Sequence, residues 1–184
     1  MKQVSARIAI GLWLLLPFGA AWADDIYQAP DLFVAESFGG VPPEPNLLWL
    51  TAPVQEGVQT IMGRKLKQLR LRYWAGEGRT VWVLDEIGKV KPITAGFVVK
   101  GGEIERMRVL IFRESHGWEV RYPVFADQFQ GLSLVSDLEL SEGIDGISGA
   151  TLSVNALRRL ARLALYLHGQ TPEGAREGVD HGDE

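Results

Sequence analysis

One short stretch of the sequence combines residue types and a spacing that could hold a chemical group: residues 145–153, which read DGISGATLS. Gly146 and Gly149 permit tight backbone turns, while Ser148 and Thr151 carry hydroxyl groups. The stretch runs directly into a helical pattern, so it lies where a helix has unpaired N–H groups and the positive end of its macrodipole. Small residues at such a position let an anion come close, which makes this a suitable place for a phosphate group.

The helical pattern that follows is carried by apolar residues at steps of four, four, three and four positions, which mark one face of an α-helix. These residues are Leu152, Ala156, Leu160, Leu163 and Leu167. The pattern predicts an amphipathic helix that begins within the stretch, with Ser148 or Thr151 as its cap, and that ends at Gly169. From these residues alone, a capped helix without any ligand is the competing interpretation.

The seven residues from Asp145 to Thr151 resemble the flavinylation motif of the FMN-binding domain family. That family includes the flavin-carrying subunits of the sodium-pumping NADH:quinone reductase and related complexes, and many exported electron carriers. The resemblance implies that Thr151 carries FMN through a phosphoester bond, made by a dedicated FMN transferase that uses FAD and Mg²⁺. It also implies that the neighbouring motif residues form the cofactor site, namely Asp145, Ser148, Gly149, Ala150 and Leu152.

A second region resembles the same family. Residues 93–115 read ITAGFVVKGGEIERMRVLIFRES, which is similar to the central hairpin of the family, and the loop that follows lies where the family has E-T-P-G-L-G. Glu114 and Gly117 match that loop, whereas His116, Trp118 and Glu119 depart from it. The resemblance, which covers roughly residues 91–170, implies that Glu114, Gly117 and Trp118 lie near the flavin. Trp118 could stack on the flavin ring or could equally be a core or edge aromatic residue.

The remaining patterns predict an α+β fold. Residues 51–63 read as a short helix, and residues 69–73, 80–87, 92–99 and 104–112 read as strands. The pair Gly101–Gly102 is a tight hairpin signal between the last two of these strands. We therefore expect a single domain over residues 51–170, with an antiparallel sheet packed by the amphipathic C-terminal helix and by shorter helices.

The two ends of the chain have different compositions from this domain. Residues 1–23 have two positive charges, a short apolar run and an A-x-A site, which together predict a Sec signal peptide and a periplasmic protein. Residues 24–50 contain four prolines and a Gly-Gly pair, and we expect an irregular arm there. Residues 171–184 are rich in glycine and acidic residues and are expected to form a flexible tail.

Composition excludes several classes of function. The chain has 184 residues, no cysteine and a formal charge of −4. The absence of cysteine excludes disulfides, iron–sulfur clusters and c-type haem attachment, and the charge gives no basic face for nucleic acid. The three histidines, His116, His168 and His181, have no metal-ligand spacing, so no metal site is expected.

The resemblance, together with the predicted signal peptide, implies an exported flavoprotein electron carrier with covalent FMN, more a redox carrier than a self-standing enzyme, with no small-molecule substrate assigned. Its expected partners are the FMN transferase and a membrane-bound or periplasmic redox protein. Two alternatives stay open: a module that binds FMN without a covalent bond, and a flavin-free periplasmic binding or structural module. A flavin-dependent reductase is ranked last, because the sequence has no nicotinamide-binding motif.

Overall fold

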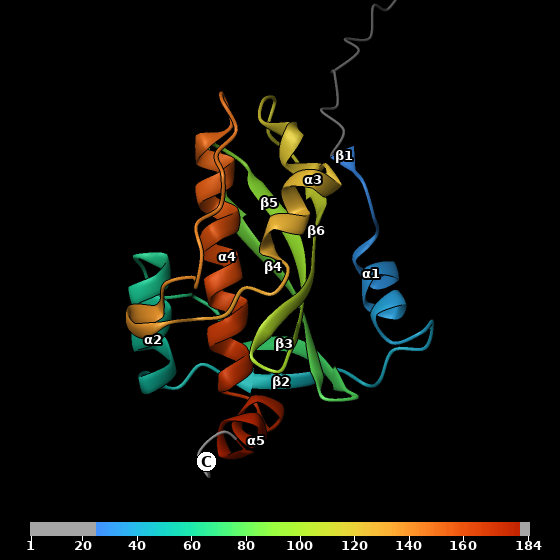
Figure 1. The fold of residues 1–184 in the computed structure, drawn as a ribbon, viewed down its shortest axis with the longest axis vertical. Helices are drawn as coiled ribbons and strands as arrows, with labels where there is room; N and C mark the ends of the chain where they lie inside the picture. Colours follow the sequence, from blue (N-terminus) through green and yellow to red (C-terminus); the bar gives the residue numbers. More distant parts are fainter. Residues whose placement is uncertain (1–24, 181–184) are drawn as a thin grey trace, which may run out of the picture.

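Six antiparallel strands and one long helix organise the chain in the computed structural model, which describes residues 25–180 (Figure 1). The predicted signal peptide at residues 1–23 lies outside the described residues. The strands are β1 (Asp25–Ile26), β2 (Asn46–Trp49), β3 (Arg70–Gly76), β4 (Arg79–Ile87), β5 (Pro92–Lys100) and β6 (Glu103–Phe112). They lie in the order β1-β6-β5-β4-β3-β2, so that strands β2 to β6 form a meander and β1 adds the far edge beside β6.

The helices lie on both faces of this sheet (Figure 1). They are α1 (Pro30–Ser37), α2 (Ala52–Met62), α3 (Pro123–Ala126), α4 (Thr151–Gly169) and α5 (Pro172–Asp180), with 3₁₀ turns η1 (Trp118–Arg121), η2 (Asp127–Phe129) and η3 (Ser136–Leu138). Helices α4 and α2 cover one face, and α1 covers the other. The predicted α+β domain, with an antiparallel sheet packed by a C-terminal helix, is therefore confirmed. No helix within residues 25–180 is long and apolar enough to cross a bilayer.

The turn between β5 and β6 follows the glycine signal. Lys100 pairs with Glu103, and the two residues between them, Gly101 and Gly102, have φ values of +63° and +71°. Positive φ at both central residues is the geometry of a type I′ turn, which matches the twist of the flanking strands. This turn fixes the register of the two strands that pack against α4.

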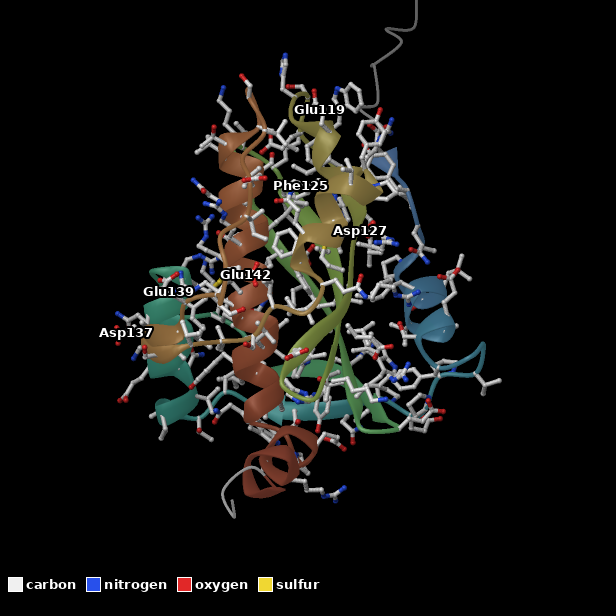
Figure 2. All side chains as sticks on the ribbon, viewed as in Figure 1. Glu119, Phe125, Asp127, Asp137, Glu139 and Glu142 are labelled. Carbon is white, nitrogen blue, oxygen red and sulfur yellow. The ribbon has the colours of Figure 1, made fainter. Side chains whose placement is uncertain are left out.

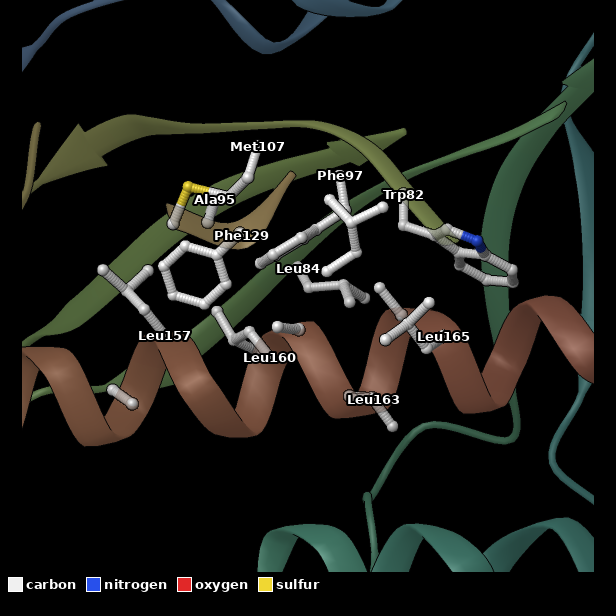
Figure 3. Close-up of a cluster of buried hydrophobic side chains, with 14 of the residues drawn as sticks. Trp82, Leu84, Ala95, Phe97, Met107, Phe129, Leu157, Leu160, Leu163 and Leu165 are labelled. Atoms are coloured by element: carbon white, nitrogen blue, oxygen red, sulfur yellow. The ribbon is translucent and has the colours of Figure 1, made fainter. Parts of the chain in front are cut away.

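Helix α4 owes its position to a core that it shares with the sheet. Figure 3 shows Leu157 and Leu160 of α4 directed toward Phe129, with Phe97 of β5 nearby, while Leu163 points to the side where α2 packs. All five side chains are at most 2% exposed. Burial of a large apolar side chain contributes about 1.5–3 kcal/mol, so this contact holds α4 firmly on the sheet.

A buried polar contact fixes the far end of α4. The Thr80 Oγ1 atom of β4 lies 2.8 Å from His168 Nδ1 and accepts the Trp82 Nε1–H at 2.9 Å. All three residues are at most 2% exposed. Because buried polar groups that lose their partners are costly, this arrangement ties the end of α4 to the middle of the sheet.

The arm over residues 24–50 is more ordered than its prolines suggested. It contains strand β1, helix α1 and strand β2, so the expected irregular arm is corrected at these three elements. Pro30 occupies the first turn of α1, where proline is favoured, and Phe33 and Val34 bury themselves against the sheet. A Cβ atom added to Gly96 of β5 would come within 3.0 Å of the Phe33 ring, so the missing side chain makes room for α1.

The end of the chain also differs from its expected form. Residues 172–180 form helix α5 where a flexible tail was predicted. Thr171 begins this helix, because its hydroxyl accepts the N–H of Gly174 at 3.3 Å and its carbonyl accepts the N–H of Ala175. Threonine followed by Pro172 is a helix-start signal that the acidic, glycine-rich composition of the segment obscured.

Candidate functional site

The segment from Asp145 to Ala150 approaches α4 with its backbone held at several points. The Asp145 N–H donates to Gln128 Oε1 at 2.7 Å, and the Ala150 N–H donates to the Ile147 carbonyl at 2.9 Å. Gly149 has a φ of +82°, which lets the chain turn into the helix. The side chains of Asp145 and Ser148 are exposed, so these two motif residues face solvent rather than the core.

Thr151 is the first residue of α4, and its side chain is exposed. The residue at the cap position is Ala150, which has no side chain able to cap, so the predicted capping by Ser148 or Thr151 is not formed. The first intrahelical hydrogen bond runs from the Val154 N–H to the Ala150 carbonyl at 2.9 Å. The N–H groups of residues 151–153 therefore precede the helical ladder and point outward at its positive end.

A pocket of about 460 Å³ opens beside Thr151. Three segments line it: the start of α4, the turn between β4 and β5, and the loop after β6. Its lining residues are Lys89, Val90, Ser115, His116, Gly149, Ala150, Thr151, Leu152 and Ser153. The volume is within the range of small-molecule sites, and the site offers a hydroxyl, helix N–H groups and a cation, which are groups that suit a phosphate-bearing ligand.

In Figure 1 the start of α4 and the loop after β6 lie at the same end of the molecule, and Figure 2 places Glu119 at that end. Gly117 brings the loop onto the helix. It is buried, its φ is +83°, and a Cβ atom there would lie 3.0 Å from Ser153 Oγ and 3.2 Å from Ala150 Cβ. A residue with a side chain would push the loop away from α4. Gly117, which was expected near the flavin, therefore packs the loop onto the helix and does not itself line the pocket.

Glu114 does not line the pocket. Its Oε1 atom instead accepts three backbone N–H groups, from Lys89 at 2.6 Å, Val90 at 2.6 Å and Lys91 at 2.8 Å. Three successive N–H groups of this kind form a nest that binds an anion. The glutamate that the sequence placed at the cofactor therefore holds the turn that forms one wall of the pocket.

These hydrogen bonds change the acidity of the carboxyl group. Partial burial raises the pKa of Glu114, but the N–H groups of Val90, Lys91 and Lys89 outweigh it, and the pKa lies below its ordinary value. A lowered folded-state pKa stabilises the fold fully above the unfolded-state pKa of about 4.3, and this stabilisation is lost as the pH falls through the lower folded-state value.

Glu114→Gln is therefore expected to melt at a lower temperature than the wild type at pH 7, and the two melting temperatures should converge in acid. Thermal unfolding of both proteins between pH 7 and pH 3 measures the difference. Glu142→Gln, at an exposed glutamate, controls for the loss of one carboxylate. If the melting temperature of Glu114→Gln were lower than that of the wild type by the same amount at every pH, the lowered pKa of Glu114 would be contradicted.

Trp118 lies elsewhere than the resemblance implied. It is 40% exposed and does not line the pocket. Its ring instead meets Tyr122 edge-on, with a centroid separation of 5.7 Å, and the Arg121 guanidinium lies 5.0 Å from its centroid. In this arrangement Trp118 belongs to an aromatic cluster around Arg121, on the outer side of the loop.

Five of the lining residues were not predicted from the sequence. Lys89 and Val90 come from the turn between β4 and β5, some sixty positions before Thr151, and nothing in their own neighbourhood marks them. Ser115 lies next to the matched Glu114, and its Oγ atom is 2.9 Å from the Nδ1 atom of His116, which also lines the pocket. Ser153, the fifth, is buried behind Gly117.

The arginines of α4 hold the segment that leads into the motif. Arg158 donates to the carbonyl of Ile144, and Arg162 donates to the carbonyl of Leu138 at 2.5 Å and pairs with Glu139 at 2.9 Å. Figure 2 shows Glu139 and Glu142 beside α4. Both arginines are therefore engaged by this segment. Among residues 25–180, no group of three or more acidic or histidine side chains is placed to hold a metal ion.

The fold and the pocket define a small α+β domain with a ligand site at the start of its long helix. Residues 88–166 match the family model of the FMN-binding domain. This part of the chain therefore belongs to the FMN-binding domain family, and every lining residue of the pocket lies within it. No curated protein and no solved structure matches the chain.

Proposed function

We propose that this protein is an exported flavoprotein that carries electrons on FMN bound covalently to Thr151. The observation that carries the proposal is the exposed hydroxyl of Thr151 beside a pocket, in a domain of the FMN-binding family. Exposure matters because a separate enzyme must reach this oxygen to attach the cofactor. A hydroxyl engaged in capping the helix would be less accessible, and Thr151 has no such role.

The attachment would be a phosphoryl transfer. The Thr151 Oγ atom attacks the phosphorus on the riboflavin side of FAD in the active site of an FMN transferase that uses Mg²⁺. A bond from Oγ to that phosphorus forms, the bond within the pyrophosphate breaks, and AMP leaves, while the hydroxyl proton passes to a base of the transferase. Atoms and charges balance without a further reactant.

The residues of the site fit the bound cofactor. The N–H groups of residues 151–153 at the positive end of α4 would offset the charge that remains on the phosphate. The flavin ring would occupy the pocket between the start of α4 and the loop after β6. When bound, the flavin supplies the redox chemistry, and the chain supplies position and electrostatic environment.

Covalent attachment suits a protein outside the cytoplasm. A dissociated flavin would be diluted and lost there, whereas a tethered one stays with the chain. The pattern of residues 1–23 supports export to the periplasm. The electron donor or acceptor would then be a periplasmic or membrane-bound redox protein.

The experiment that tests the proposal is the intact mass of the chain after coexpression with an FMN transferase. We expect a gain of ~438 Da, the mass of FMN less one water. Without the transferase, the mass should be unmodified. An unmodified mass despite an active transferase would refute covalent binding, and flavin released on denaturation would then indicate the non-covalent module.

A further inference from the structure

The turn between β4 and β5 lines the same pocket as Thr151. Residues 88–91 connect the two strands, and the Gly88 N–H donates to the Lys91 carbonyl at 3.1 Å. Lys89 and Val90, at its tip, are exposed and line the pocket. A tip of this kind has no core residues of its own to keep it in place, so its position depends on other contacts.

Glu114 supplies those contacts from outside the turn. A single carboxylate oxygen accepts the three successive N–H groups of residues 89–91, at 2.6 to 2.8 Å. Gly88 permits this approach, because a Cβ atom there would lie 3.1 Å from the same oxygen. Hydrogen bonds to a charged acceptor are short and strong, so the carboxylate determines the shape of the turn.

The turn gives the pocket a positive charge, which suits the negative charges of bound FMN. Among the described residues that line the pocket, Lys89 is the one with a permanently charged cationic group, and the others are neutral apart from the titratable His116. One oxygen of the Glu114 carboxylate, Oε1, accepts the backbone N–H groups, and Glu114 itself does not line the pocket. A cation opposite an anionic ligand, in a partly enclosed site, acts more strongly than one in open water.

We propose that Glu114 is a positioning residue that holds the β4–β5 turn so that Lys89 is the cation of the flavin pocket and raises the flavin's potential. The proposal rests on the proposed function. Lys89 would oppose the charge of the phosphoester, and also the negative charge that the ring gains when a reductant supplies two electrons and one proton is taken up. Stabilising the reduced, anionic form makes the flavin easier to reduce.

The test is a redox titration of the covalently loaded protein with dithionite. Lys89→Met should shift the midpoint potential to a more negative value, through a threefold to tenfold change in the reduction equilibrium, or about 15–30 mV for a two-electron couple. Lys100→Met makes the same change of charge on an exposed lysine outside the pocket and should leave the potential unchanged. Equal potentials for Lys89→Met and the wild type, or equal shifts for both variants, would overturn the proposal.

A second pair of variants tests the positioning role. Glu114→Ala and Glu114→Gln remove the same negative charge, but only Glu114→Gln keeps an acceptor oxygen for the turn, so Glu114→Ala should have the more negative midpoint potential of the two. Hydrogen exchange of the unloaded protein should show that the amides of residues 89–91 lose protection in Glu114→Ala. Unchanged exchange there would refute the role of Glu114 without any flavin present.

The outcomes separate the two proposals. A wild-type chain that carries no flavin after coexpression refutes the proposed function, and the role of Lys89 falls with it. If the wild-type chain is loaded but Lys89→Met has the same midpoint potential, only the further inference is refuted. Only molecules that carry flavin contribute to the redox titration, so the midpoint potential of an incompletely loaded variant can still be measured.

Discussion

Thr151→Ala is expected to abolish the covalent flavin and leave the fold intact. The variant removes the only hydroxyl that the motif assigns as acceptor, so the mass gain of ~438 Da should disappear completely rather than decrease. The fold should survive because the Thr151 side chain is exposed and makes no capping bond, and alanine is a strong helix former. Intact mass and far-UV circular dichroism measure the two effects.

Two further variants make the result specific. Thr151→Ser keeps a hydroxyl at the same position and should retain the added mass. Thr60→Ala removes the hydroxyl of another exposed helical threonine, on α2, and should also retain it. Flavin fluorescence from Thr151→Ala on a denaturing gel would show that another residue carries the cofactor.

The contact between α1 and the sheet should give the largest effect on stability. Phe33 is fully buried, and its ring occupies the place of a side chain at Gly96. Phe33→Ala is expected to cost about 3–5 kcal/mol of unfolding free energy. Gly96→Ala introduces a methyl group where the ring already lies and should cost about 1–3 kcal/mol.

The double variant tests whether the Phe33 ring and the new methyl group at position 96 compete for the same space. When Phe33 and Gly96 are both alanine, the new methyl group lies in the space that the ring has left. The combined loss should therefore be smaller than the sum of the single losses, by about 1 kcal/mol or more, since residues in contact are not additive. Urea unfolding of the four proteins measures it, and strict additivity would show that the two residues do not share this space.

Much of the fold could be predicted because its patterns are periodic. The apolar steps of four and three along α4, and the Gly101–Gly102 pair between strands, each specify local geometry directly. The arm was harder, because α1 is short and its order comes from Phe33 inserting over Gly96, a contact between residues 63 positions apart. Proline and glycine composition reports local breaks and says nothing about such a contact.

Some residues of the site could likewise be predicted from the sequence, and others could not. The motif identified Thr151, since its residues are contiguous and lead into a periodic helix. Lys89 and Val90 could not be found, because only the folded chain brings the β4–β5 turn to the start of α4. For Trp118 the sequence left two roles open, stacking on the flavin ring or an edge aromatic residue. It follows Gly117, which packs onto α4, and its ring contacts Arg121 and Tyr122 rather than the pocket.

The antiparallel sheet extends beyond the stretch that matches the family model. The family match begins at Gly88, between β4 and β5, whereas β4 pairs with β5 along its full length, from Arg79 opposite Lys100 to Ile87 opposite Pro92. Trp82 and Leu84 of β4 also fill the core beneath α4. A piece that began at residue 88 would leave β5 with an unpaired edge and α4 over a partial core, a surface prone to association. The recognisable sequence is thus shorter than the cooperative structure, and the part that would touch the cofactor depends on strands that carry no family signature.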